Sequence, residues 1–123
     1  IMANKLNLTL EELFVLAAQG DPIEISAMCT VFAESEVINY IGEGRNKEDI
    51  AAGVIDSVAQ KVSQLAGRAK IKDEVILTGG LSNVAYFAKV LSEKLNTPVH
   101  TTENGKFAGS YGAALLAKEK KKR

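Results

Sequence analysis

The stretch VILTGGLSN, Val75 to Asn83, decides the fold predicted for this chain. Its short apolar run leads into Thr78 and the pair Gly79-Gly80, a pattern typical of a buried strand that ends in a tight turn. A helix is expected next, from about Ser82 to Leu95. The sequence at this point therefore changes from a strand pattern to a helix pattern within a few residues.

A second strand after that helix completes the unit. Asn96-Thr97-Pro98 breaks the helix, and VHTT, Val99 to Thr102, has the pattern of a short strand. Strands joined by one helix are parallel, with a right-handed crossover. We therefore predict an α/β fold with one βαβ unit, closed by a helix from about Phe107 to Lys118.

The residues before Gly67 carry helical patterns. Thr9-Leu10-Glu11-Glu12 is a capping box, and Asn46 is expected to cap a long helix that ends at Gly67 and has Asp49 in its first turn. A further helix should follow Cys29 and end at Gly42 and Gly44. The apolar faces expected to be buried are Leu10, Leu13, Phe14 and Ala17; Ala33, Val37, Tyr40 and Ile41; and Ile50, Val54, Val58, Val62 and Leu65.

The composition is that of a folded protein without a strong charge. With 123 residues, 46% of them hydrophobic and 24% charged, the chain is long enough for one domain, residues 1–123. The formal net charge of zero argues against nucleic acid as a partner. No apolar run approaches the roughly 20 residues of a membrane span, and one cysteine makes no internal disulfide. A cytoplasmic protein is expected, and the helical pattern that begins at Ile1 without a cap indicates a segment of something longer.

Three features are candidates for chemistry, and each has a structural alternative. Cys29 precedes a helix, where the dipole favours thiolate, the metal-binding form, but a free cysteine is also a small hydrophobe. Gly79 and Gly80 either admit a ligand to the backbone or form only a turn. Gly109 and Gly112 cost helix stability, which we attribute to close packing rather than to a ligand or hinge. An iron–sulfur cluster is usually held by four thiolates, so Cys29 would need further cysteine ligands from outside this chain.

Four motifs in order, CTVFAESEVI, IAAGVIDSVAQKV, VILTGGLSN and GSYGAALLA, resemble one family. They are similar to the carboxyl-terminal half of the ATP-dependent activators of 2-hydroxyacyl-CoA dehydratases and benzoyl-CoA reductases, the BadF/BadG/BcrA/BcrD ATPase family. The resemblance runs from about Leu6 to Lys118. It implies part of the second domain of an actin-like, sugar-kinase-like ATPase, a ribonuclease H-like fold, rich in helices.

The resemblance also implies a function and a set of ligands. These activators are homodimers that bind ATP or ADP with Mg²⁺, share one 4Fe–4S cluster between subunits, and pass a low-potential electron to a dehydratase or reductase. Cys29 matches one cluster ligand. Gly79 and Gly80 match the adenosine motif, Gly109 and Gly112 match the helix near the domain hinge, and the long helix from Lys47 matches one that lines the adenine side of the cleft.

Departures from the family pattern leave alternatives open. The amino-terminal phosphate loop and the second phosphate motif are absent, as is the Cys-Ala-Ala-Gly-Thr-Gly stretch of the second cluster ligand. No catalytic residue is assigned, and this stretch alone is expected to be inactive. The alternatives are a non-enzymatic α/β interaction module and a piece of another kinase-like member of the superfamily. Cys29 in CTVFAESE argues for the activators, because a sugar kinase has no use for it.

Overall fold

The computed structural model describes residues 1–26, 30–69, 71 and 74–121. The chain divides into two compact units, Ile1–Lys70 and Ile71–Arg123, which are described separately. The first unit is helical and the second is a small α/β unit. The assignment of residues 1–123 to one domain stays a prediction.

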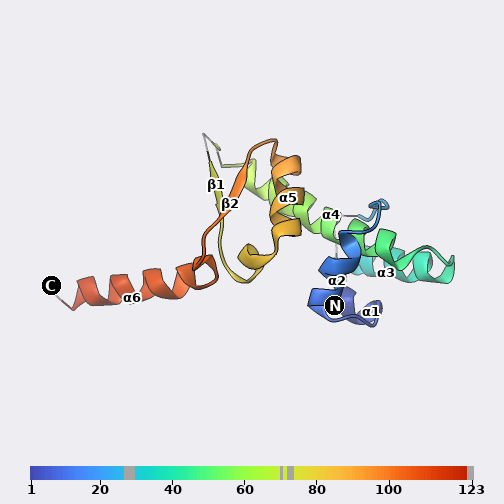
Figure 1. The fold of residues 1–123 in the computed structure, drawn as a ribbon, viewed down its shortest axis with the longest axis horizontal. Helices are drawn as coiled ribbons and strands as arrows, with labels where there is room; N and C mark the ends of the chain where they lie inside the picture. The colour runs from blue at the N-terminus through green and yellow to red at the C-terminus, as the bar shows by residue number, and fades with distance from the viewer. Residues whose placement is uncertain (27–29, 70, 72–73, 122–123) are drawn as a thin grey trace. The chain divides into compact units, whose positions relative to one another are not determined.

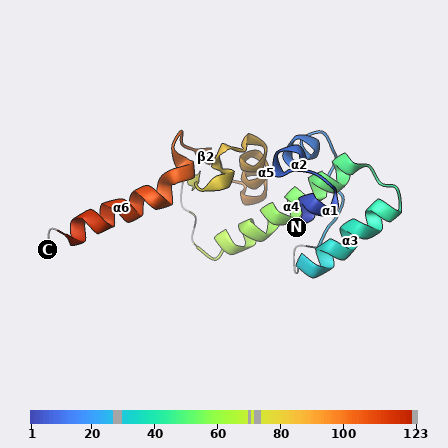
Figure 2. The same cartoon turned by 90° about the horizontal axis from the view of Figure 1, so that it is seen from below.

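The described residues of the first unit form four helices, α1 (Met2–Lys5), α2 (Leu10–Ala17), α3 (Thr30–Gly42) and α4 (Lys47–Ala66). Both α2 and α3 pack on α4, and α1 packs on α3. Figures 1 and 2 show α4 as the long helix around which the unit is built. The helices predicted around these positions are therefore confirmed.

The capping box predicted at Thr9 is present at the start of α2. The Glu12 backbone N–H donates to Thr9 Oγ1 over 3.2 Å, and the Thr9 backbone N–H donates to Glu12 Oε2 over 2.7 Å. The hydrogen bond from the Thr9 backbone N–H, and after it the hydrogen bonding of the Thr9 hydroxyl to the same carboxyl, lowers the pKa of Glu12. At α4, Asn46 occupies the cap position with Glu48 and Asp49 in the first turn, but its side chain makes no capping hydrogen bond.

The predicted buried faces are correct near the centre of the unit and wrong at its margins. Leu13, Phe14 and Ala17 of α2, Ala33 and Val37 of α3, and Ile50 and Val54 of α4 are buried. Leu10 and Ile41 are exposed, Tyr40 and Val62 are half-buried, and Val58 and Leu65 are 43% and 54% exposed. The apolar stripe of α4 thus continues past the part of the helix that α2 and α3 cover.

Residues 21–26, here called the connector, join α2 to the residues before α3 without regular secondary structure. The connector crosses α4 at Gly53, where a Cβ would lie only 2.4 Å from the Ile23 carbonyl oxygen. Ile25 of the connector is buried. Glycine at position 53 therefore lets a backbone segment lie directly on the helix.

The second unit contains the predicted βαβ unit. Strand β1 (Val75–Leu77) pairs in parallel with β2 (Val99–Thr101), with Val75 opposite Val99. The two strands form a sheet of order β1–β2 and are joined by α5 (Ala85–Leu95). The helix begins later than predicted, because residues Gly80–Asn83 form a separate 3-10 turn, η1. Among the described residues of this unit, one edge of β1 has no paired strand (Figure 1).

Helix α5 supplies the core of the second unit, where it packs on β2 and η1. Its buried residues are Phe87, Ala88, Val90 and Leu91. After a short 3-10 turn, η2 (Gly105–Phe107), the chain enters α6 (Ala108–Lys120), which extends away from the sheet of its own unit (Figure 1).

The close packing predicted for Gly109 and Gly112 is wrong for the described part of the chain. A Cβ built on either glycine meets no heavy atom within 4 Å, and none of the residues of α6 is buried.

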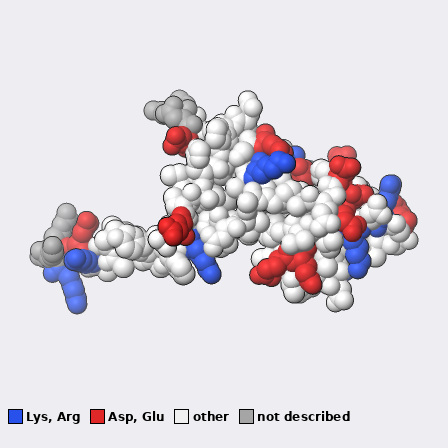
Figure 3. All heavy atoms as spheres, viewed as in Figure 1, with Lys and Arg blue, Asp and Glu red and all other residues white. Residues whose placement is uncertain are grey.

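Lysines lie near the end of this helix, while acidic and basic side chains mix elsewhere on the face drawn in Figure 3. Among the described residues, no helix is both long and apolar enough to cross a bilayer.

Candidate functional site

The loops that follow β1 and β2 meet at one edge of the sheet. Since the strands are parallel, both loops leave from the carboxyl ends, where open α/β sheets bind ligands. The Gly79 backbone N–H donates to the Gly105 carbonyl oxygen over 3.0 Å and joins the two loops. Gly79 has a φ of 89°, a conformation that glycine adopts without strain.

The backbone of the first loop is open. A Cβ built on Gly79 or Gly80 meets no heavy atom within 4 Å, so the space beside this backbone is available to a ligand. The second loop and the first turn of α6 line a hollow of about 580 Å³. Its lining residues are Thr102, Asn104, Phe107, Ala108 and Tyr111. Two aromatic rings together with hydroxyl and amide groups suit a planar ligand that carries polar atoms.

Ser82 lies beneath this edge. It is 3% exposed, and its hydroxyl has no hydrogen-bond partner among the described residues. A Cβ built on Gly105 would lie 3.2 Å from Ser82 Oγ and 3.0 Å from Thr102 Oγ1. The loops after β1 and β2 therefore pack closely around Gly105, next to the buried Ser82 hydroxyl.

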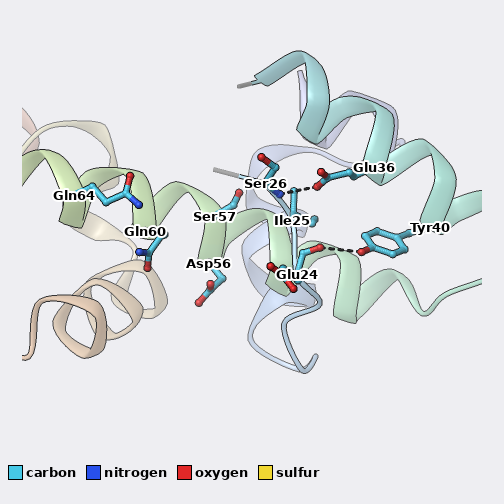
Figure 4. A pocket seen from close by; sticks show the side chains of 9 residues that line it. All are labelled: Glu24, Ile25, Ser26, Glu36, Tyr40, Asp56, Ser57, Gln60 and Gln64. Carbon is cyan, nitrogen blue, oxygen red and sulfur yellow. Dashed lines mark hydrogen bonds between the residues drawn. The ribbon is translucent and has the colours of Figure 1, made fainter. Parts of the chain in front are cut away.

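A second hollow, of about 620 Å³, lies in the first unit between the connector, α3 and α4 (Figure 4). Helix α4 contributes Asp56, Ser57, Gln60 and Gln64, and the other lining residues are Glu24, Ile25, Ser26, Glu36 and Tyr40. The lining holds three carboxylates and no lysine, arginine or histidine. The connector, α3 and α4 each contribute one of these carboxylates, so the hollow has a polar, acidic lining.

The predicted metal ligand, Cys29, lies outside the described residues. Within the described residues, no group of three or more His, Cys, Asp or Glu side chains is placed to hold a metal ion. The sequence contains one thiol, that of Cys29. A thiolate is a suitable ligand for an iron–sulfur cluster, but this one supplies only one of the four cysteine ligands that such a cluster usually has.

Comparison with known proteins decides the family. The model of the BadF/BadG/BcrA/BcrD ATPase family matches residues 1–117. The chain belongs to this family. A curated family relative, the (R)-2-hydroxyglutaryl-CoA dehydratase activating ATPase of Acidaminococcus fermentans, is 40% identical over 121 residues. That match covers 98% of this chain and 46% of the relative, so the chain spans about half the length of the curated relatives it matches.

Solved structures of the BadF/BadG/BcrA/BcrD ATPase family confirm the fold. The crystal structure of component A of the A. fermentans dehydratase superposes with a TM-score of 0.89 at 39% identity, covering 99% of this chain and 48% of that one. The activator of the 2-hydroxyisocaproyl-CoA dehydratase from Clostridium difficile, with bound ADPNP, gives 0.82 at 34% identity, covering 98% and 47%. The α/β architecture, rich in helices, is therefore that of the actin-like activator ATPases.

The sequence-predicted glycines all lie in the second unit. Gly79 and Gly80 lie in the loop after β1. Gly109 and Gly112 lie in the first turns of α6, which begins beside the hollow lined by Phe107 and Tyr111. The sequence did not single out Ser82, Thr102 or Asn104 as members of this edge. It also gave no role to Glu36, although this glutamate stands in the quoted CTVFAESE motif.

Proposed function

We propose that this chain is part of an ATP-dependent, iron–sulfur activator that passes a low-potential electron to a 2-hydroxyacyl-CoA dehydratase or benzoyl-CoA reductase. The observation that carries the proposal is the open glycine backbone at Gly79 and Gly80, joined to the Gly105 loop at the carboxyl edge of the strands. Parallel α/β sheets bind ligands at this edge, which supports a nucleotide there, and a relative of the same fold has ADPNP bound.

In this proposal the second unit binds the adenosine side of ATP or ADP. Gly79 and Gly80 allow the nucleotide to approach the backbone. Gly109 and Gly112, which have no side chains, leave space beside the start of α6, the helix that matches the one near the domain hinge of the family. The hollow beside Phe107 and Tyr111 lies next to this edge. Phosphates and Mg²⁺ would be held by motifs outside this chain, because its sequence has no phosphate loop.

Cys29 is proposed as one ligand of a 4Fe–4S cluster shared by the two subunits of a homodimer. When bound, the cluster supplies one-electron chemistry at low potential. The sequence supplies one cysteine, so the remaining thiolates in this proposal come from outside it. A reducing compartment, the cytoplasm, suits such a centre.

A nucleotide titration of the full-length protein tests the proposal. Gly80→Val fills open space, so it should leave the fold intact and weaken binding of a fluorescent ADP analogue at least about tenfold, the effect of losing roughly 1.4 kcal/mol. Gly42→Ala, also in open space but far along the sequence, is the control. Unchanged affinity in Gly80→Val would refute the assignment of this edge.

The chain by itself should bind nucleotide weakly or not at all, because it carries only the adenosine side. A tight ligand raises the melting temperature through its binding free energy, by roughly 2.7 kcal/mol at a hundredfold excess over Kd. Millimolar ATP should therefore leave the melting temperature of this chain unchanged. A clear ATP-dependent rise would show that the phosphate motifs are dispensable.

A further inference from the structure

A third hollow, of about 290 Å³, lies in the first unit and shares no lining residue with the two hollows described above. It is formed where the end of α1, the end of α3 and the start of α4 come together. Its lining residues are Lys5, Leu6, Asn7, Ile41, Arg45 and Lys47. Three of the six are cationic and none is a carboxylate, so we call this hollow the basic hollow.

The turn that ends α3 brings two of the cations to the basic hollow. The Arg45 backbone N–H donates to the Tyr40 carbonyl oxygen over 3.0 Å. The Gly44 N–H donates to the Ile41 carbonyl oxygen over 3.1 Å, and Gly44 has a φ of 73°. This pair of hydrogen bonds around a left-handed glycine is the Schellman motif, which reverses the chain at a helix end. Arg45 and, two residues later, Lys47 therefore lie on a hydrogen-bonded turn.

The end of α1 has the same pattern and supplies the third cation. The Leu8 N–H donates to the Ala3 carbonyl oxygen over 2.9 Å. The Asn7 N–H donates to the Asn4 carbonyl oxygen over 3.1 Å, and Asn7 has a φ of 56°, a conformation that asparagine tolerates better than most residues. Lys5 is the last residue of α1. Because α1 also packs on α3, both turns meet at the basic hollow.

The cations keep donors to spare. Lys5 Nζ lies 2.7 Å from Glu34 Oε1, and Arg45 Nε lies 3.4 Å from Glu43 Oε2. The two basic side chains are 42% and 59% exposed, so water screens both pairs and they contribute little. An ammonium group has three N–H donors and a guanidinium group has five, and each pair uses one of them. Within the described part of the chain, Lys47 forms no ion pair.

A phosphate group matches this lining better than a carboxylate does. Three cations around one space suit an anion with more than one charge, and the outer nitrogens of Arg45 can bind two of its oxygens at once. The hollow is wide enough for more than a bare ion, because one water takes only about 30 Å³. Leu6 and Ile41 add apolar surface beside the charges, which suits the carbon part of a phosphate ester.

We infer that the basic hollow binds the phosphate group of a small phosphorylated ligand, with Arg45 and Lys47 as the main contacts and Lys5 as the third. The inference does not depend on the proposed function. The nucleotide edge proposed above is made by glycine backbone in the second unit, whereas the basic hollow is made by side chains of the first unit.

The test is a titration of the isotope-labelled chain followed by amide NMR spectra. The probes are inorganic phosphate, glycerol phosphate and acetate, each added at constant ionic strength. Both phosphate probes should shift the amides of residues 5–7 and 44–47, and glycerol phosphate should bind at least as tightly as the free ion. Acetate should bind more weakly than either. Phosphate held at the nucleotide edge would shift the amides of Gly79 and Gly80 instead, so the two sites are distinguished.

Two variants and a matched control give the magnitude. Arg45→Gln and Lys47→Gln should each weaken glycerol phosphate binding about threefold to fivefold, the effect of removing one exposed charge from an ionic contact. Lys61→Gln removes the same charge from an exposed position of α4 and should change nothing. It lies 14 residues beyond Lys47, about 20 Å along the helix, which is farther than a Debye length of about 10 Å.

Several results would overturn the inference. One is a wild-type titration without shifts at residues 5–7 and 44–47, and another is equal affinity in Lys47→Gln and Lys61→Gln. Acetate binding as tight as phosphate binding would assign the basic hollow to a carboxylate, such as an acidic segment of another protein. Binding of the free ion without binding of the ester would exclude a larger phosphorylated ligand.

Discussion

Replacing Gly53 with alanine is expected to destabilise the first unit, although alanine is the better helix former. The new Cβ would lie 2.4 Å from the Ile23 carbonyl oxygen and 3.1 Å from Ile25 Cδ1. A relaxed non-bonded separation is about 3.5 Å, so the connector would have to move by roughly 1 Å. That movement would strain the hydrogen bond from the Ile23 N–H to the Asp49 carbonyl oxygen, which is already 3.4 Å long.

Two opposing terms set the magnitude. Overpacking a buried site costs about 1–3 kcal/mol, and weakening one hydrogen bond adds about 1 kcal/mol. Alanine in place of glycine within a helix returns about 1 kcal/mol. The net loss of unfolding free energy in Gly53→Ala should therefore be about 1–3 kcal/mol, so the steric term exceeds the helix propensity.

Urea denaturation of the chain, followed by circular dichroism at 222 nm, measures this loss. With a slope of about 2 kcal/mol per molar urea, the midpoint should fall by about 0.5–1.5 M. Gly42→Ala is the control, because it places the same methyl group on a helical glycine of the same unit with no atom within 4 Å. A Gly53→Ala midpoint at or above that of the wild type would refute the close approach of connector and helix.

Three further outcomes are expected. Ser82→Ala should raise the unfolding free energy by about 1 kcal/mol, because it removes a buried hydroxyl that has no hydrogen-bond partner in the described part of the chain; a lower melting temperature would contradict this. Gly109→Ala and Gly112→Ala should each raise the helicity and stability of α6 by about 1 kcal/mol in this chain, whereas a loss would reveal a close neighbour. The lowered pKa of Glu12 stabilises α2 at pH values above the ordinary pKa of glutamate, and this contribution should disappear as the pH falls through the lowered pKa; a pH titration by circular dichroism should show a weaker acid dependence in Glu12→Gln.

Local signals in the sequence were sufficient for most of the fold. The capping box at Thr9, the glycine turn after β1 and the break at Asn96 each depend on residues within a few positions, and each is confirmed. The burial of α4 was predicted too far along the helix, to Leu65. Periodicity shows which face of a helix is apolar but does not show how much of that face another element covers.

The contacts that the sequence could not predict join residues far apart in the chain through the backbone. The Ser26 N–H uses a carboxylate ten positions later, and Gly53 meets the carbonyl group of Ile23, thirty positions earlier. Neither leaves a spacing pattern, because a backbone group is the same at every residue. The family resemblance named Cys29 and four glycines, but it did not indicate that Glu36 and Tyr40 of α3 form hydrogen bonds to the backbone of the connector.

The register of the two strands has a consequence for how the second unit folds. Val75 pairs with Val99, so the paired residues of the sheet are 24 positions apart in the sequence, with the whole of α5 between them. The entropy lost on closing such a loop must be recovered elsewhere, and two strands of three residues each recover little of it. Helix α5, whose contacts are local, should therefore form before the strands meet, and the sheet should close late and open early. Truncating Phe87 or Leu91 to alanine, which leaves a cavity, is then expected to speed unfolding. Hydrogen exchange should increase first at the backbone amides of β1 and β2.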